Sequence, residues 1–91
     1  MKEFTHLGFN NWVQARQIAV IQVPGSAPAV RFIQEARQRN VLVDVTQGRK
    51  TKTILVLVSG QIVLSALTPD TIIGRVENGT RQANKSQDPE S

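Results

Sequence analysis

The sequence predicts an α+β fold: a small single domain with an antiparallel β-sheet of about five strands, one main helix after the second strand and a short C-terminal helix. Two observations predict this class. Short runs rich in β-branched residues follow one another across tight turns, as antiparallel strands do. Two other segments place apolar residues at helical spacing behind residues that suit a helix N-terminus. We expect the domain to cover residues 1–78, and residues 79–91, which are polar and aperiodic, to form a disordered tail.

The first two strands are expected near the N-terminus. Residues 4–9 form the shorter strand and residues 11–22 the longer one, with the turn at residues 8–11. The longer strand alternates only in part, which predicts a bulge near Arg16 and Gln17.

The main helix is predicted over residues 27–39. Ser26 suits the N-cap, and Asn40 can end the helix. Pro28 is tolerated in the first turn, because its missing N–H would be unpaired there. One helical face carries the apolar residues Ala29, Phe32, Ile33 and Ala36.

Three further strands are expected at residues 41–46, 51–58 and 61–67. Their short connections predict an antiparallel meander. The strand expected at residues 51–58 is apolar on both faces, which favours a central position in the sheet. The last helix begins at Thr68 as N-cap, with Pro69 at the first helical position.

The composition argues against several functional classes. The chain has no cysteine, which excludes thiol catalysis, disulfides and thiolate metal sites and fits a cytoplasmic protein. No apolar run approaches the roughly 20 residues that cross a bilayer, and the N-terminus does not resemble a signal peptide, so we expect no membrane partner. His6 is the only histidine, and no metal-ligand spacing, phosphate loop or dinucleotide fingerprint is present. We therefore expect no enzyme, no cofactor and no small-molecule substrate.

The net charge of +4 is concentrated in one part of the chain. Between Arg31 and Lys52 lie six cations and two acids, while the rest of the chain is neutral overall. A local excess of this kind indicates an anionic partner, with nucleic acid ahead of a membrane surface.

The candidate binding site is residues 47–52, which connect the predicted strand at residues 41–46 to the predicted strand that begins at residue 51. Gly48 allows a tight turn, which we expect at the tip of a hairpin with two paired strands as its stem. The candidate side chains are three cations and a hydroxyl, namely Arg49, Lys50, Lys52 and Thr51. Arginine can fork across a phosphate, lysine acts as a mobile point charge, and a hydroxyl can donate to a phosphate oxygen. The alternative interpretation is a hairpin tip whose charges only keep it soluble.

Two residues outside this connection have alternative interpretations. Arg16 either faces solvent or approaches the same anion as residues 47–52. Trp12 can stack on a base, but burial in the core or at a subunit contact is the favoured interpretation.

Several motifs follow one another in a single order without gaps. They are Gly8-Phe9-Asn10-Asn11, Ser26-Ala27-Pro28 leading into Arg31 and Gln34-Glu35-Ala36-Arg37, Gly48-Arg49-Lys50-Thr51-Lys52, and Leu64-Ser65-Ala66 before Thr68-Pro69. Together they resemble the RemA-like family of small bacterial regulators, known for activating biofilm-matrix genes by binding DNA. The resemblance covers residues 7–76.

The resemblance implies a DNA-binding transcriptional regulator or architectural protein that is cytoplasmic and associated with the bacterial nucleoid. It also implies a ring-like homo-oligomer that presents the same basic turn repeatedly to double-stranded DNA. The family's adjacent pair of DNA-contacting cations falls on Arg49 and Lys50. Lysine in place of arginine at the second position keeps the charge but not the bidentate geometry, which favours phosphate contact there.

A further DNA-contacting arginine of the family lies in the first long strand. Ungapped alignment puts Gln17 at that position and Arg16 one residue earlier, and a one-residue step on a regular strand reverses the face. A bulge would restore the face, so we assign this contact to Arg16.

Each chain would offer only a few phosphate contacts, so several chains in one assembly would raise the avidity, typically about 10²- to 10⁴-fold. The alternative function is an oligomeric scaffold that binds another protein and no nucleic acid. RNA is a weaker candidate partner, because one tryptophan and three phenylalanines provide few rings for base stacking.

Overall fold

The computed structural model describes residues 3–78, so the predicted tail at residues 79–91 lies outside the described residues. The described chain is an α+β domain with two helices and two sheets. Its elements, in chain order, are β1 (Phe4–His6), β2 (Trp12–Gln14), the 3₁₀ turn η1 (Ala15–Gln17), β3 (Ile18–Gln22), α1 (Ala27–Gln38), β4 (Leu42–Asp44), β5 (Thr53–Leu57), β6 (Ile62–Ser65) and α2 (Pro69–Asn78).

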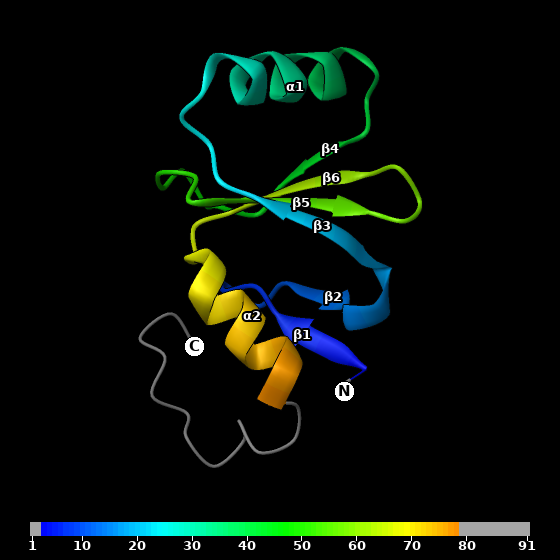
Figure 1. Cartoon of the computed structure of the whole chain (residues 1–91), viewed down its shortest axis with the longest axis vertical. Helices are drawn as coiled ribbons and strands as arrows, with labels where there is room; N and C mark the ends of the chain where they lie inside the picture. The colour runs from blue at the N-terminus through cyan, green and yellow to red at the C-terminus, as the bar shows by residue number, and fades with distance from the viewer. Residues whose placement is uncertain (1–2, 79–91) are drawn as a thin grey trace.

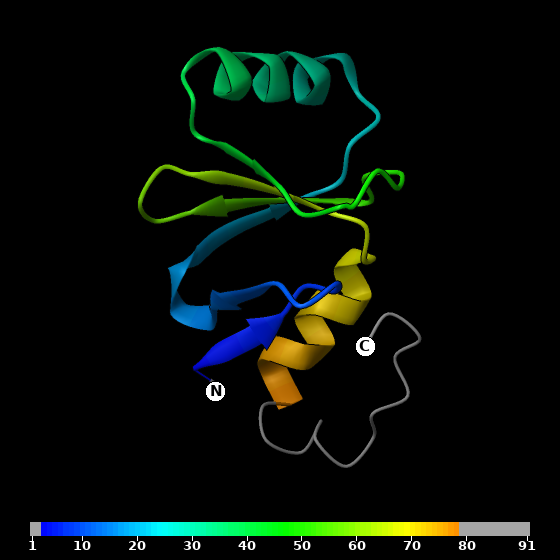
Figure 2. The ribbon, with the colours of Figure 1, turned by 180° about the vertical axis from the view of Figure 1, so that it is seen from behind.

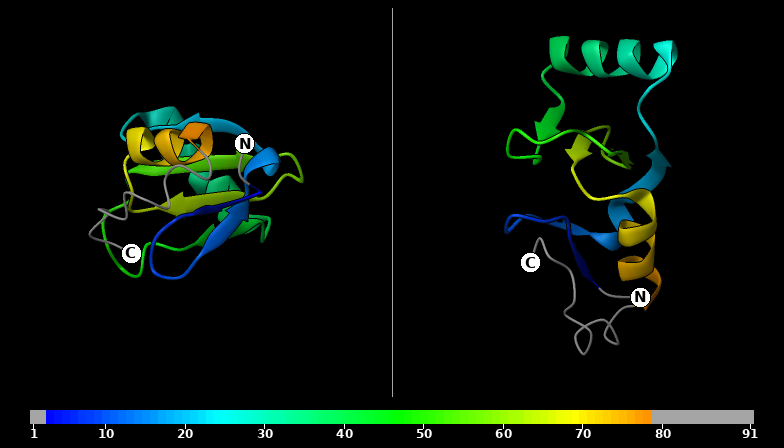
Figure 3. Two further views of the ribbon diagram at one scale, coloured as in Figure 1. Left: turned by 90° about the horizontal axis from the view of Figure 1, so that it is seen from below. Right: turned by 90° about the vertical axis from the view of Figure 1, so that its left-hand side faces the viewer.

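The four-stranded sheet, with strand order β3-β5-β6-β4, forms the middle layer of the molecule (Figure 1). Helix α1 covers one face, while the two-stranded β1-β2 sheet and α2 lie on the other, as the side view in Figure 3 also shows. Alternation along the strands divides the core between these faces. On β5, Ile54 joins the core under α1, and its neighbour Leu55 joins the core on the opposite face. Both side chains are fully buried.

The predicted three-stranded meander is wrong in one pairing. β4 runs parallel to β6, with Leu42 opposite Ile62, and does not pair with β5. The predicted central position of β5 is confirmed, because it lies between β3 and β6. β6 is buried along its whole length, so it also takes an inner position and leaves the more exposed β4 at the edge. Residues 45–52 are therefore a crossover past the end of β6 and not a hairpin.

The predicted single strand over residues 11–22 is also wrong, because η1 divides it into β2 and β3. β2 pairs with β1, which confirms the short partner strand, whereas β3 pairs with β5 in the other sheet. Ala15 is buried in the turn, and the N–H of Val58 donates to the carbonyl of Gln17 at 2.7 Å. The described chain thus has six strands in two sheets, one of them mixed, and α1 follows the third strand instead of the second.

The predicted signals at the ends of the helices are confirmed. The Ser26 hydroxyl accepts the N–H of Ala29 at 3.1 Å, at the start of α1. Asn40, just after the end of α1, has a φ of 60°, as residues that terminate helices often do. The Thr68 hydroxyl accepts the N–H of Thr71 at 3.3 Å, at the start of α2.

Candidate functional site

The basic loop, defined as residues 45–52, connects β4 to β5 and projects from one end of the four-stranded sheet (Figure 1). It begins in a turn in which the N–H of Arg49 donates to the carbonyl of Thr46 at 3.0 Å. The central residues Gln47 and Gly48 have φ of 57° and 79°. Positive φ at both positions is the pattern of a type I′ turn, and Gly48 adopts it without the steric strain of a side chain.

Asp44 holds the start of the basic loop. Its Oδ1 accepts the hydroxyl of Thr46 at 2.6 Å and the N–H of Thr46 at 2.9 Å. The hydroxyl bond first, then the N–H bond and the charge of Arg37, lower the pKa of the Asp44 carboxyl below its ordinary value. The carboxylate therefore acts as an acceptor that stabilises the turn.

The two ends of the basic loop are fixed to the buried strand β6. The N–H of Val45 donates to the carbonyl of Leu64 at 3.0 Å, and the N–H of Lys52 donates to the carbonyl of Ser65 at 2.9 Å. β6 thus lies between the start and the end of the loop and forms its stem. The predicted stem of two directly paired strands is absent from the described chain.

The candidate side chains of the basic loop are accessible. Arg49, Lys50 and Lys52 are exposed, and Thr51 is half-buried. Within residues 3–78, none of these three cations forms an ion pair with a carboxylate. Their charges are therefore available to an anion from outside the chain.

A second loop meets the basic loop at this end of the sheet. The aromatic loop, defined as residues 7–11, joins β1 to β2, and the ring centroid of Phe9 lies 5.3 Å from the guanidinium carbon of Arg49. The Ser65 hydroxyl donates to the carbonyl of Leu7 at 3.3 Å, which ties the aromatic loop to β6 as well. Sequence reasoning missed Phe9 as a neighbour of the candidate site. The Gly-aromatic-X-Asn motif marked the segment but gave no indication of the distant loop that it meets.

The structure does not bring Arg16 to the basic loop. Arg16 is exposed on η1, beside the C-terminal end of β5, whereas the basic loop enters β5 at its N-terminal end. Figure 1 and Figure 2 show the two segments on opposite sides of the molecule, across its shorter dimension. The ends of the five-residue strand β5 are roughly 13 Å apart at the usual rise per residue. Within one chain, Arg16 and the basic loop therefore do not form a joint site.

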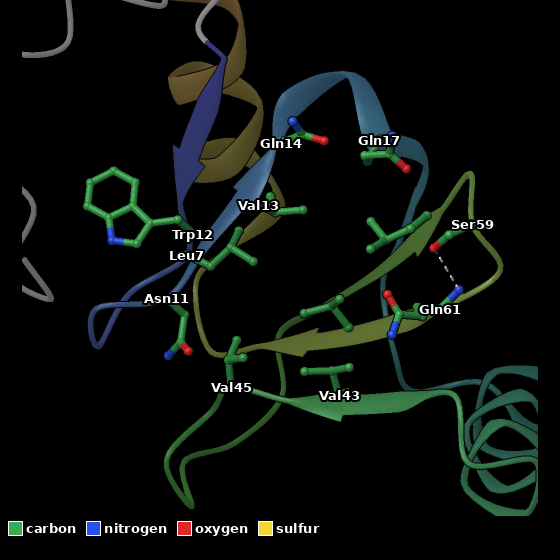
Figure 4. Close-up of a pocket in the computed structure, with 12 residues that line it drawn as sticks. Leu7, Asn11, Trp12, Val13, Gln14, Gln17, Val43, Val45, Ser59 and Gln61 are labelled. Carbon is green, nitrogen blue, oxygen red and sulfur yellow. Dashed lines mark hydrogen bonds between the residues drawn. The ribbon is translucent and has the colours of Figure 1, made fainter.

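An apolar groove of about 440 Å³, here called the edge groove, opens between β2 and the β4 edge of the large sheet (Figure 4). Its apolar lining comes from both layers and consists of Leu7, Val13, Val43, Val45, Leu57 and Val63, with Trp12 at the rim. The polar lining side chains are amides and one hydroxyl. None of the described residues that line the edge groove is charged.

Trp12 is 60% exposed, and its indole turns away from the edge groove (Figure 4). The prediction that Trp12 is buried in the core is therefore wrong, while the predicted subunit contact stays a prediction. The His6 ring packs against the indole, with 4.5 Å between ring centroids. Nη1 of Arg75 donates to the carbonyl of His6 at 2.7 Å. Burial first, and then the charge of Arg75, lower the pKa of His6.

Metal binding and membrane insertion find no support in the part of the chain that the structure describes. No group of three or more His, Cys, Asp or Glu residues within 3–78 is placed to hold a metal ion. Neither helix in this range has the length and apolar character that a bilayer span requires.

Known proteins resemble this chain over most of its length. The family model described as RemA-like, extracellular matrix regulatory protein A-like, matches residues 4–76. Three relatives, each provisionally named as a regulatory protein, come from Dictyoglomus turgidum (49% identical over 81 residues, 89% of this chain and 95% of the relative), Synechococcus elongatus (52% over 71 residues, 78% and 82%) and Bacillus cytotoxicus (45% over 75 residues, 82% and 86%). The residues that the family model matches include both the basic loop and the aromatic loop.

Proposed function

The chain belongs to the RemA-like family, and on that premise we propose that it is a DNA-binding regulator that acts as a homo-oligomer at the bacterial nucleoid. Each chain presents its basic loop to the backbone of double-stranded DNA. The observation that carries this proposal is a loop with three exposed cations whose two ends are both fixed to the buried strand β6. The regulatory names of relatives at 45–52% identity agree with a binding role.

The chemistry of the basic loop suits phosphate better than base edges. The guanidinium of Arg49 can donate to two phosphate oxygens, whereas Lys50 and Lys52 supply point charges that tolerate several geometries. The Thr51 hydroxyl can donate to a further oxygen. Phosphate contacts do not distinguish one base sequence from another, so DNA shape and deformability would provide the specificity.

Assembly supplies the affinity that a single basic loop lacks. Two to four phosphate contacts per chain give weak binding at physiological salt, because each contact releases only about one condensed counterion. Several loops held in one assembly raise the effective concentration and increase avidity by about 10²- to 10⁴-fold where the geometry matches the DNA. In such an assembly, Arg16 of one chain can contact the same DNA as the basic loop of another.

The edge groove is the surface that we assign to self-assembly, with a second copy of the chain as its occupant. Chains with a net charge of +4 repel one another, so a contact surface without cations avoids adding to that repulsion. The edge groove has this property, since its described lining carries no charge. Beside the groove, the 60% exposed Trp12 adds a residue of the aromatic type that is enriched at protein interfaces.

The double variant Arg49→Ala/Lys50→Ala tests the proposed function. The wild type should bind duplex DNA with an affinity that falls steeply with salt. Loss of two phosphate contacts per chain should make the plot of log affinity against log salt less steep, by about 1.8 in slope for each bound chain. We expect the variant to lose retention in a gel shift, while light scattering shows an intact oligomer. The control Arg31→Ala/Arg39→Ala removes the same charge from exposed positions on and next to α1.

Two outcomes would contradict this proposal in different ways. Equal DNA retention by the wild type and by Arg49→Ala/Lys50→Ala would reject the basic loop as the contact. Failure of the wild type to bind DNA in a salt-sensitive manner would favour the alternative function, an oligomeric scaffold that binds another protein.

A further inference from the structure

We infer that Phe9 is a positioning residue for Arg49, so that the aromatic loop and the basic loop form one DNA-contacting unit. This inference rests on the proposed function, because it gives Phe9 a role in the DNA contact of Arg49. Three observations support it: the position of the Arg49 guanidinium over the Phe9 ring, the backbone conformation of the aromatic loop, and the attachment of both loops to β6.

The aromatic loop holds Phe9 in a conformation that residues with large side chains rarely adopt. Phe9 and Asn10 have φ of 54° and 64°. The side-chain amide of Asn11 donates to the carbonyl of Phe9 at 3.1 Å, and the main-chain carbonyl of Asn11 accepts the N–H of Leu7 at 2.7 Å. These hydrogen bonds close the loop around the unusual residues. Backbone strain persists only where the surroundings hold it, and it is concentrated at functional sites.

The position of the Phe9 ring leaves the donors of Arg49 free. A guanidinium carries five N–H donors, and an aromatic ring attracts the cation electrostatically without occupying all of them. The guanidinium carbon of Arg49 lies over the ring at 5.3 Å. This contact restricts the side chain without using the donors that a phosphate needs. Because Arg49 is otherwise exposed, the ring reduces the rotamer freedom that DNA binding would have to remove.

Both loops are supported by the same residue of β6. The hydroxyl of Ser65 donates to the carbonyl of Leu7, the first residue of the aromatic loop, at 3.3 Å. The main-chain carbonyl of Ser65 accepts the N–H of Lys52, the last residue of the basic loop, at 2.9 Å. Ser65 is fully buried. The two loops that carry Phe9 and Arg49 are therefore each attached at one end to the same buried residue, although they are far apart in the sequence.

A double-mutant cycle on Phe9 and Arg49 tests the inference. Phe9→Leu keeps an apolar side chain and removes the ring, whereas Phe9→Tyr keeps the ring. We expect Phe9→Leu to weaken binding of a labelled duplex, measured by fluorescence anisotropy, by about 2- to 5-fold for each bound chain. The salt slope should stay unchanged, because no charge is lost. Phe9→Tyr should retain the wild-type affinity, and Phe9→Leu should have no further effect in the Arg49→Ala variant.

Equal weakening by Phe9→Leu with and without Arg49 would overturn the inference, because the effect would not pass through Arg49. Phe9→Asn is the control for distortion of the aromatic loop by leucine, because asparagine tolerates positive φ. Wild-type affinity in Phe9→Asn would show that the ring has no role and would also overturn the inference. Thermal unfolding followed by Trp12 fluorescence checks that each variant is folded.

The same measurements distinguish failure of this inference from failure of the proposed function. Weaker binding in Arg49→Ala together with full binding in Phe9→Leu rejects the positioning role alone. Full binding in both Arg49→Ala and Arg49→Ala/Lys50→Ala rejects the basic loop as the DNA contact, and the role of Phe9 with it.

Discussion

The basic loop and the edge groove belong to one small sheet but differ in charge and in support. The basic loop carries three exposed cations, and none of them has a carboxylate partner within residues 3–78. The edge groove, in contrast, has no charge among its described lining residues. Hydrogen bonds to β6 hold the ends of the loop, whereas the groove is open apolar surface beside an edge strand. The net charge of +4 is therefore distributed unevenly, in a way that suits a polyanion at one region and a second cationic chain at the other.

The largest effect is expected from a charge placed in the edge groove. Val43 lines the groove and is 39% exposed, so Val43→Lys should change the isolated chain little. In the proposed assembly the new cation would be buried without a partner. We expect the oligomer to dissociate in light scattering and DNA affinity to fall by about 10²-fold or more, because avidity is lost.

The matched control for this variant is Val30→Lys, which places the same charge at an exposed apolar position of α1. It should leave both the oligomer and the DNA affinity unchanged. An intact oligomer in Val43→Lys would remove the edge groove as the surface of self-contact and, with it, the functional contrast between the two regions.

A smaller effect is expected from loosening the start of the basic loop. Asp44→Ala removes the acceptor of two hydrogen bonds from Thr46. Because Asp44 is exposed, the free energy of unfolding should fall by only about 1 kcal/mol, measured by chemical denaturation. DNA affinity should also fall, with the oligomer unchanged.

The sign of the change in DNA affinity makes the Asp44→Ala experiment decisive. Loss of a negative charge by itself strengthens DNA binding, so a weaker affinity would report the lost geometry of the loop. Glu35→Ala, which removes an exposed carboxylate from α1, provides the effect of charge alone. Equal increases in affinity in the two variants would mean that the geometry held by Asp44 does not matter for binding.

The smallest effect is expected from pH, through His6 beside the groove-rim residue Trp12. Burial and then Arg75 lower the pKa of His6 from its ordinary value of 6.5, so the unfolded chain binds the proton more readily than the folded chain. This contribution to stability is fully present above pH 6.5 and is lost as the pH falls through the lower pKa of the folded state. The wild-type unfolding midpoint, followed by Trp12 fluorescence, should fall on acidification through this window.

His6→Gln should lose that part of the pH dependence, because it has no imidazole to protonate. The Asp44 carboxyl does not interfere, since its pKa is lowered from 3.8 and it titrates in more acidic solution. A midpoint that falls equally in the wild type and in His6→Gln would assign the pH dependence to groups other than His6.

Features that depend on residues close together in the sequence were predictable. Ser26 and Thr68 were expected to cap the two helices, and both accept the expected main-chain N–H. The turn at Gly48 and the exposed cations after it were also expected. Arg49 was thus identified as a candidate site residue, but its ring partner was not, because no local pattern specifies which loops meet.

The predicted pairing of β4 with β5 shows where sequence reasoning reached its limit. Strands that follow one another in a chain usually lie side by side, so a hairpin was the natural expectation. β6, however, is buried along its whole length and needs a neighbour on each side. That requirement separates β4 from β5 and converts the predicted hairpin tip into a crossover.

The sequence by itself determined the helix ends, the central apolar strand and a cationic connection, because hydrogen bonds and side-chain spacing over a few residues decide these features. Only the tertiary structure decided that Phe9 meets Arg49, that Arg16 lies at the opposite end of β5, and that an uncharged groove opens at the sheet edge. The physical reason is that segments distant in the chain compete for buried positions, and the outcome depends on all of them together.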